Sequence, residues 1–364
     1  MHLDEVRESL ERALVCHDQC LFASPTVQTI RKQTVAPSRK ALIAELLRRG
    51  RISWDRDSVR LMYLGENSGL QREWCICGLD ETAVLQAARA DAVDAGLAPD
   101  GVREIQARQR ATGNPFGLPE DAGPIRQCNM IFFCEAATRH FFPDLIGAIQ
   151  AIISALGLDA GVVSRGTAGY ELFDLGLRDD ARAGVDALCS RLRESRATVV
   201  VCESPGAVYA LRHLASEPQP FETLHLSEFL ARHLKSDAPS WRDTVKIAVT
   251  LHDSSLLARY LGVTEAPRDV LRAIPGVELR EMRHHGRLAH PSGPGLWFPA
   301  DEARKAMSDA RVAEVAETGA STVVTLGPYA RRNLSESAGR HGLQVIDLAQ
   351  LVAARLEVRT WQQA

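Results

Sequence analysis

A short sequence pattern that occurs twice constrains the fold of this chain more than any other feature. The β-branched run at residues 198–201, Thr-Val-Val-Val, precedes Ser-Pro-Gly-Ala at residues 204–207. A similar run at residues 322–325, Thr-Val-Val-Thr, precedes Gly-Pro-Tyr-Ala at residues 327–330. Such internal similarity indicates two copies of one supersecondary unit, and we expect a pseudo-twofold axis to relate them.

The region that holds these repeats has the pattern of an α/β fold. From Asp121 onward, short β-branched runs alternate with segments of helical periodicity, which is typical of strands layered with helices. The expected strands are residues 131–133, 160–163 and 198–202, and the expected helices are residues 143–156, 181–194 and 205–214. The segment 238–241 is a predicted boundary before the second copy.

The first 120 residues predict helices. Apolar side chains recur at helical spacing in residues 3–13. A second helix is expected at residues 38–49, with Ser38 as its N-cap and Gly50 as its end, and a third helix at residues 81–95.

Composition excludes several classes of protein. A chain of 364 residues is long enough for two or three domains, and its net charge of -3 predicts no nucleic-acid partner. The acidic N-terminal segment does not fit a signal peptide, and the longest apolar segment, residues 145–158, is too short for a transmembrane segment. Eight cysteines scattered over a chain of this size do not indicate a secreted disulfide framework, so we expect a cytoplasmic protein.

Three segments carry a resemblance to a known family. Cys134 follows a predicted strand, residues 167–176 include Thr-Ala-Gly-Tyr and end in Leu-Gly, and residues 204–207 read Ser-Pro-Gly-Ala. This order resembles the CCG domain of iron-sulfur electron-transfer subunits, which have Cys, then Cys-Cys-Gly-Tyr with a Leu-Gly tail, then Cys-Pro-Gly-Cys. The resemblance implies that most cluster ligands have been replaced here.

The second copy resembles the same domain and also lacks its thiols. The family has His-Asp-Pro-Cys, then Cys-Cys-Gly before a glycine-rich loop, then Cys-Pro-x-Cys. Here residues 252–255 read His-Asp-Ser-Ser, residues 289–291 read Ala-His-Pro, and residues 327–330 read Gly-Pro-Tyr-Ala.

The N-terminal loops resemble those of a helical ferredoxin module. In that register the ligand positions retain Cys20 in one loop and Cys75 in the other. The resemblance therefore implies an α/β protein with an N-terminal all-α ferredoxin-like module at residues 1–120. Two pseudo-symmetric CCG-type α/β domains, residues 121–241 and 242–364, are expected to follow it.

The resemblance also identifies candidate ligands. Cys20, Cys75 and Cys134 occupy vestigial cluster positions, although Cys134 after an apolar strand is also typical of a buried core residue. Thiolates and imidazoles from the two N-terminal loops could together bind Zn or a smaller cluster; these residues are Cys16, His17, Cys20, Cys75 and Cys77. A weaker candidate is a histidine cluster formed by His252, His284, His285 and His290.

The function that the resemblance implies is that of a non-catalytic scaffold or docking subunit in a flavin-dependent oxidoreductase complex. Its partner would be a flavoprotein dehydrogenase or an electron-transferring flavoprotein, and no cofactor of its own is expected. The alternative is an electron-transfer protein with a [4Fe-4S] or other metal centre. Because the replacements in the former cluster cleft are mostly small, an open polar cavity is predicted there, and such a cavity could bind a small molecule.

Overall fold

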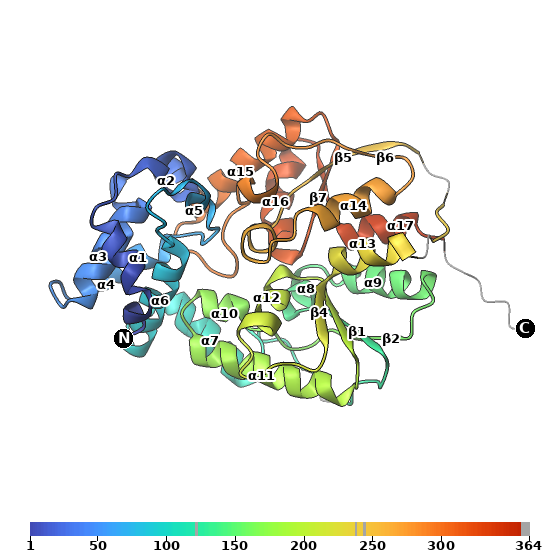
Figure 1. The fold of residues 1–364 in the computed structure, drawn as a ribbon, viewed down its shortest axis with the longest axis horizontal. Coiled ribbons are helices and arrows are strands. Elements are labelled where there is room, and N and C mark those ends of the chain that lie inside the picture. The colour runs from blue at the N-terminus through green and yellow to red at the C-terminus, as the bar shows by residue number, and fades with distance from the viewer. Residues whose placement is uncertain (121–122, 237–238, 243–244, 358–364) are drawn as a thin grey trace, which may run out of the picture.

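The computed structural model of this chain contains two parallel four-stranded sheets and many helices (Figure 1). It describes residues 1–120, 123–236, 239–242 and 245–357, except for the side chains of Cys20 and Ser236. The first sheet has the order β2-β1-β3-β4 and the second the order β6-β5-β7-β8. The strands are β1 (Met130–Phe133), β2 (Ala160–Val163), β3 (Val199–Cys202), β4 (Glu222–His225), β5 (Ile247–Leu251), β6 (Val277–Leu279), β7 (Thr322–Thr325) and β8 (Gln344–Asp347).

The two sheets confirm the α/β prediction and have the same strand order. All neighbouring strands are parallel, so each is followed by a crossover that carries helices. The repeated β-branched runs form β3 and β7, the strands third in chain order within their sheets, whose residues are mostly buried. Such runs suit strands covered on both faces.

Helices connect and cover the strands. In the first sheet region they are α8 (Ala136–Phe141), α9 (Asp144–Ala155), α10 (Tyr170–Asp174), α11 (Arg178–Glu194), α12 (Pro205–His213) and α13 (Leu226–Ser236). In the second they are the π-helical turn η4 (Leu256–Tyr260), α14 (Glu265–Ala273), the 3-10 turn η5 (Gly286–Leu288), α15 (Asp301–Glu317), α16 (Pro328–Arg340) and α17 (Leu348–Arg355). Helix α11 begins before the predicted residue 181, because its first turn is charged and lacks an apolar period.

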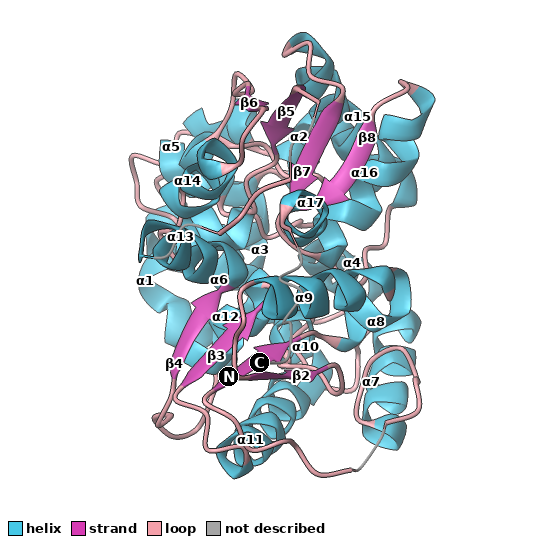
Figure 2. Cartoon of the chain, turned by 90° about the vertical axis from the view of Figure 1, so that its right-hand side faces the viewer, coloured by secondary structure: helices cyan, strands magenta, loops and turns pink. Residues whose placement is uncertain are grey.

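The two sheet regions pack against each other reciprocally. Helix α9 of the first region contacts α17, the last helix of the second, and α13, the last helix of the first, contacts α14 of the second. Figure 2 shows the two sheets one above the other with α9, α13 and α17 between them. One apolar core contains side chains of both regions, including Phe132 and Leu224 of the first and Val249 and Val324 of the second.

The N-terminal part is helical throughout, as predicted, within residues 1–120. Its elements are η1 (His2–Val6), α1 (Arg7–Ala13), η2 (Gln19–Ala23), α2 (Pro25–Ile30), η3 (Gln33–Val35), α3 (Pro37–Arg48), α4 (Arg56–Tyr63), α5 (Leu70–Trp74), α6 (Glu81–Asp94) and α7 (Asp100–Thr112). The prediction of Ser38 as an N-cap was wrong. Helix α3 begins at Pro37, whose missing N–H costs nothing at a first helical position, and the Ser38 hydroxyl donates to Asp18 instead.

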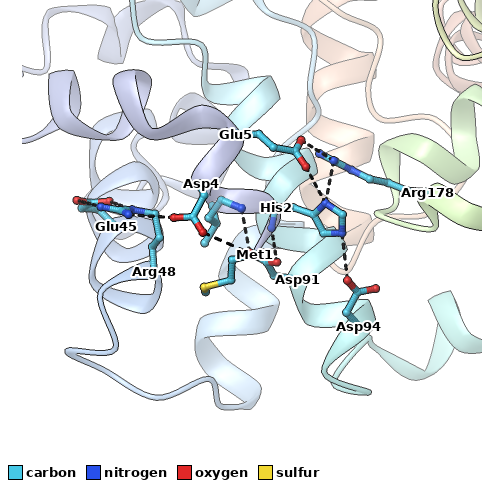
Figure 3. A network of polar contacts seen from close by, with 10 residues as sticks. Met1, His2, Asp4, Glu5, Glu45, Arg48, Asp91, Asp94 and Arg178 are labelled. Carbon is cyan, nitrogen blue, oxygen red and sulfur yellow. Dashed lines mark hydrogen bonds and ion pairs between the residues drawn. The ribbon is translucent and has the colours of Figure 1, made fainter.

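A polar network ties the first residues to the rest of the molecule (Figure 3). The Asp91 carboxylate accepts hydrogen bonds from the backbone N–H groups of His2, at 2.7 Å, and Leu3, at 3.1 Å. From the first sheet region, Arg178 of α11 donates to Glu5 at 2.7 Å. The helical part is thus fixed to α11 by charge-assisted hydrogen bonds.

The predicted domain boundaries stay predictions. The boundary at Asp121 and part of the segment 238–241 fall on residues 121–122 and 237–238, outside the described residues. Within the described ranges, no helix is both long enough and apolar enough to cross a membrane.

Candidate functional site

A cavity of about 140 Å³ lies where the two sheet regions meet the N-terminal part. Its walls include the loop after α4, helix α10 and the segments that follow β3, β5 and β7. The polar side chains that line it include Tyr170, Glu171, Ser204, His252, Tyr329 and Asn333. The small residues Ser204, Ser254, Ser255 and Gly327 also line it, so the wall of the cavity includes polar groups beside apolar ones.

Strand topology explains why these residues converge. In parallel sheets the carboxyl ends of the strands share one edge, and ligand sites form there. Ser204 follows β3 and caps α12, where its hydroxyl accepts a hydrogen bond from the Gly206 N–H at 3.2 Å. His252 follows β5, and Gly327 follows β7 at the start of α16.

The two repeated tetrapeptides approach each other closely beside the cavity. Gly327 has a φ of +131°, and a Cβ placed there would lie 2.9 Å from Cδ of Pro205, in the other copy. A Cβ on Gly206 would lie 2.7 Å from Oε1 of Glu171. The positive φ of Gly327 and its approach to Pro205 therefore favour glycine there, whereas at Gly206 the nearest atom is the end of a flexible side chain.

Three buried glutamates form an acidic group next to the cavity. The Glu203 carboxylate accepts a hydrogen bond from the backbone N–H of Glu135 at 2.8 Å, and Glu135 accepts one from the Ala168 N–H at 3.1 Å. The third member, Glu171 of α10, lines the cavity itself. This group was not predicted from the sequence. Glu203 directly follows β3 and Glu135 is the second residue after β1, and such positions at the carboxyl ends of strands could have signalled it.

Burial and mutual repulsion make these carboxyl groups poor acids. Burial raises the pKa of Glu171 well above its ordinary value, and the Glu135 charge raises it further. The same two causes raise the pKa of Glu203. A carboxyl group that keeps its proton can donate a hydrogen bond or a proton to a ligand in the cavity.

His252 presents a neutral imidazole to the cavity wall. Its Nδ1 accepts a hydrogen bond from Nε of the buried Arg311 at 3.0 Å. Burial lowers the pKa of His252 to about 3, and the Arg311 charge contributes.

The structure separates the predicted histidine cluster into parts. His252 faces Arg311, and the Nδ1 atom of His285 lies 2.9 Å from the Met282 carbonyl oxygen. Only His284 and His290 come together, with ring centroids 4.1 Å apart.

Cys134 lies in the apolar core that joins the two sheet regions. Its side chain is fully buried at the end of β1 and is not among the described cavity-lining residues. Burial raises the pKa of the Cys134 thiol well above its ordinary value, and the Glu203 charge adds to the effect. The observed environment is that of a core residue.

Cys16, Cys75 and Cys77 are close enough for their charges to interact, but their sulfur atoms do not all lie within 4.8 Å of one another. Burial raises the pKa of Cys16, and the nearby thiols of Cys77 and Cys75 raise it further. Cys75 also accepts a hydrogen bond from the Leu79 N–H at 3.3 Å. His17 lies in the same loop as Cys16, whereas the Cys20 side chain falls outside the described part of the chain. The predicted five-residue metal site therefore stays a prediction.

The cavity residues do not fit a cluster held by four thiolates. Its described lining contains hydroxyl, carboxyl, amide and imidazole groups but no cysteine. A [4Fe-4S] cluster in proteins is ordinarily held by four cysteine thiolates. No step is therefore derived through a cluster at this position.

The chain resembles subunits of redox complexes. It is 27% identical over 317 residues to a subunit of the dihydromethanophenazine:CoB–CoM heterodisulfide reductase of Methanosarcina barkeri, which covers 79% of this chain and 76% of that protein. It is 24% identical over 266 residues to a subunit of the fumarate reductase (CoM/CoB) of Methanothermobacter marburgensis, covering 71% of this chain and 53% of that protein. With the EtfAB:quinone oxidoreductase of Syntrophomonas wolfei it shares 24% identity over 174 residues, or 44% of this chain and 24% of that protein.

No protein family model matches the chain. Among solved structures, a hypothetical protein from Helicobacter pylori has a similar fold, with a TM-score of 0.59 and 10% sequence identity. That likeness covers 88% of this chain and 67% of the other. It concerns the fold alone.

Proposed function

We propose, on the premise that this chain is a homologue of the CCG-domain iron-sulfur subunits of heterodisulfide reductases, that it is the docking subunit of a flavin-dependent oxidoreductase complex. In this proposal it has no catalytic centre of its own and binds a flavoprotein dehydrogenase or an electron-transferring flavoprotein. Its relatives are named as subunits of redox enzymes, and one of them is named for EtfAB. The N-terminal part would be a ferredoxin-like module that has lost its clusters.

An apolar surface on the two N-terminal loops carries the proposal. We name it the loop patch; its exposed residues are Leu14, Val15, Phe22, Trp74 and Ile76. Ile76 and Val15 are 74% and 71% exposed, and the rings of Phe22 and Trp74 meet edge to face with centroids 5.3 Å apart. Phe22 and Trp74 are in contact, and we infer that the five side chains form one contiguous apolar surface, which is the kind that marks an interaction site.

Contacts between the loops hold the patch together. Arg12 of α1 donates a hydrogen bond to the Gly78 carbonyl oxygen at 3.3 Å, which joins the helix before the first loop to the end of the second loop. Aromatic residues such as Phe22 and Trp74 contribute strongly to protein interfaces, because they bury a large area with few rotatable bonds.

The cavity supports the non-catalytic part of the proposal. Its described lining supplies no thiol ligands, while the surrounding packing and the close approach of Gly327 to Pro205 are intact. The reciprocal contacts of α9 with α17 and α13 with α14 are those that two CCG-type halves related by a pseudo-twofold axis would make.

A co-purification experiment tests the docking function. The tagged chain and a Trp74→Glu/Ile76→Asp variant are expressed in the native host and purified, and bound proteins are identified by mass spectrometry. We expect the wild type to retain a flavoprotein, visible by its flavin absorbance, and the variant to lose at least about 90% of it, since a charge in an interface core costs several kcal/mol.

A Val245→Asp variant serves as the matched control. Val245 is an apolar residue, 86% exposed and outside the loop patch, so this variant should retain the flavoprotein. Recovery of no flavoprotein by the wild type, or equal recovery by both variants, contradicts the proposal.

A second candidate function is electron transfer through a metal centre of the chain itself. It is favoured by the charge coupling of Cys16 with Cys75 and Cys77, whose sulfur atoms do not all lie within 4.8 Å of one another and would have to move closer to bind a metal ion or a small cluster. The test is anaerobic purification followed by measurement of iron, zinc and acid-labile sulfide per chain. Iron with matching sulfide, lost in Cys75→Ser, would support this candidate, and absence of both would support the docking function.

A further inference from the structure

Two imidazoles and one carboxylate meet on the second sheet region, apart from the cysteines discussed above. His284 and His290 flank η5, and Glu314 lies on α15. The Nδ1 atom of His284 lies 3.1 Å from Oε1 of Glu314, and the Nδ1 atom of His290 lies 3.0 Å from the same oxygen. Among the residues that the structure describes, this is the one set of three His, Cys, Asp or Glu ligand atoms within 4.8 Å of one another.

The spacing of these atoms suits one metal ion. Ligand atoms about 2.1 Å from an ion and roughly 90–110° apart are separated by about 3.0–3.4 Å. The observed distances of 3.0 and 3.1 Å lie at the lower end of that range. The shared oxygen can accept N–H groups from both rings, or it can bind one cation together with both nitrogens.

The surroundings hold the three side chains in place. Nη1 of Arg311 donates to Oε2 of Glu314 at 2.8 Å and to the His284 carbonyl oxygen at 2.9 Å. The His284 N–H also donates to Oε2 at 3.3 Å. One carboxylate oxygen is thus fixed by hydrogen bonds while Oε1 faces the imidazoles, as expected of outer-shell groups that orient a metal ligand.

The site is open to solvent on its imidazole side. The side chains of His284 and His290 are each 28% exposed, whereas Glu314 is 8% exposed and Arg311 fully buried. The two rings stack with centroids 4.1 Å apart and an interplanar angle of 11°, so one ring has to turn for both nitrogens to bind the same ion in their ring planes. Because both rings are partly exposed, an ion can reach these nitrogens from water without unfolding the helix beneath them.

We propose that His284, His290 and Glu314 bind a single divalent transition metal ion. Two imidazoles and a carboxylate with further open positions suit Zn²⁺ and Fe²⁺. This site does not depend on the proposed docking function, because it lies on different elements and uses none of the cysteines.

Arg311 connects the three-residue site to the central cavity by hydrogen bonds. The same guanidinium that holds Glu314 donates from Nε to His252, which lines the cavity, and Pro291 directly after His290 lines it as well. An ion bound here would add positive charge behind that wall.

Metal titration of the full chain tests the proposal. The protein is stripped with a chelator and titrated with Zn²⁺ by calorimetry, and with Co²⁺ by visible spectroscopy. We expect one ion per chain and a Co²⁺ spectrum without the intense near-ultraviolet charge transfer that thiolate ligands give. His290→Gln and Glu314→Gln should each weaken Zn²⁺ binding by at least about tenfold.

Two controls separate this site from its neighbours. His285→Ala changes an adjacent histidine whose Nδ1 atom lies near the Met282 carbonyl oxygen, and a Cys16→Ser/Cys75→Ser/Cys77→Ser variant removes the loop thiols. Both should bind Zn²⁺ as the wild type does. Circular dichroism and thermal unfolding show that each variant is folded before it is titrated.

Two results would overturn the proposal. One is a wild type that binds neither Zn²⁺ nor Co²⁺. The other is unchanged Zn²⁺ affinity in a folded His290→Gln or Glu314→Gln variant. Loss of binding in the triple cysteine variant with full retention in His290→Gln would assign the metal to the N-terminal loops instead.

Discussion

Some charged side chains of this protein form ion pairs in its interior, where they are shielded from solvent. Lys40 and Glu81 form an ion pair of 2.5 Å and are 1% and 6% exposed. Burial raises the pKa of Glu81, although the Lys40 charge opposes that shift. Removing one member of such a pair costs more than removing both, because it leaves a buried charge without compensation.

Lys40→Met should therefore lower the free energy of unfolding by about 3–5 kcal/mol. The double variant Lys40→Met/Glu81→Gln should recover part of that loss, because no charge then remains unpaired. Urea unfolding at neutral pH measures both. If the double variant is no more stable than the single one, the loss comes from packing and not from charge.

Asp347 gives a stability contribution that depends on pH. Burial raises its pKa to about 6, even though the Ala349 and Gly327 N–H groups donate to it. Since this pKa lies above that of the unfolded chain, the contribution is fully present below about pH 4 and is lost as the pH rises through 6. The change is on the order of 3 kcal/mol.

Asp347→Asn should flatten the pH dependence of the unfolding free energy between pH 4 and pH 6. The absolute stability will fall, because the Gly327 N–H loses a carboxylate acceptor, so the informative quantity is the slope. Urea unfolding at several pH values supplies it. An unchanged slope in the variant would mean that other carboxyl groups, and not Asp347, account for the pH dependence.

At the scale of elements, local patterns could be predicted from sequence and contacts between distant segments could not. The strands at residues 198–202 and 160–163 were predicted, because β-branched runs report burial within the segment itself. The pairing of Glu135 with Glu203 depends on β1 lying beside β3, which no local signal specifies. For the same reason His284 and His290 were predicted from the sequence as candidate metal ligands, whereas Glu314 on α15 was not.

The glycine at the start of α16 lies where two elements approach each other closely. Gly327→Ala should lower the unfolding free energy by about 1–3 kcal/mol, since alanine is strained at a φ of +131° and its Cβ would lie 2.9 Å from Pro205. Gly295→Ala is the matched control, because a Cβ there meets nothing within 4 Å, and it should change stability by less than about 0.5 kcal/mol. Equal melting temperatures for the two variants would show that the loops can separate without cost.

At the scale of the whole molecule, buried arginines join the helical part to the sheet regions. Arg259 of η4 donates to the Ser68 carbonyl oxygen at 2.6 Å and to the Ala289 carbonyl oxygen at 2.9 Å, and it is 3% exposed. Arg89 of α6 donates in the same way to Gly65, at 2.8 Å, and to Asp174, at 2.7 Å. Planar guanidinium groups can serve several carbonyl groups at once.

Arg259→Met should cost about 3–5 kcal/mol of unfolding free energy and make the loop at residues 65–77 more sensitive to limited proteolysis. Arg259→Lys should not restore the wild-type behaviour, because one ammonium group cannot reach all of these acceptors. Arg272→Met is the control, since Arg272 is 57% exposed and its ion pairs are 3.6 and 3.8 Å long. If Arg259→Met and Arg272→Met have similar free energies of unfolding, Arg259 does not stabilise the contact between the helical part and the sheet regions.

The shared core of the two sheet regions has a consequence for how the sequence can change over evolutionary time. Helices α9, α13, α14 and α17 each cover an element from the other copy, so an altered side chain in one copy must be accommodated by its counterpart in the other. Helices α11 and α15 fill separate cores and are free of that constraint. We expect substitutions on the outer helices to be accepted independently in the two sheet regions, and substitutions in the shared core to be accepted when a contacting residue changes as well.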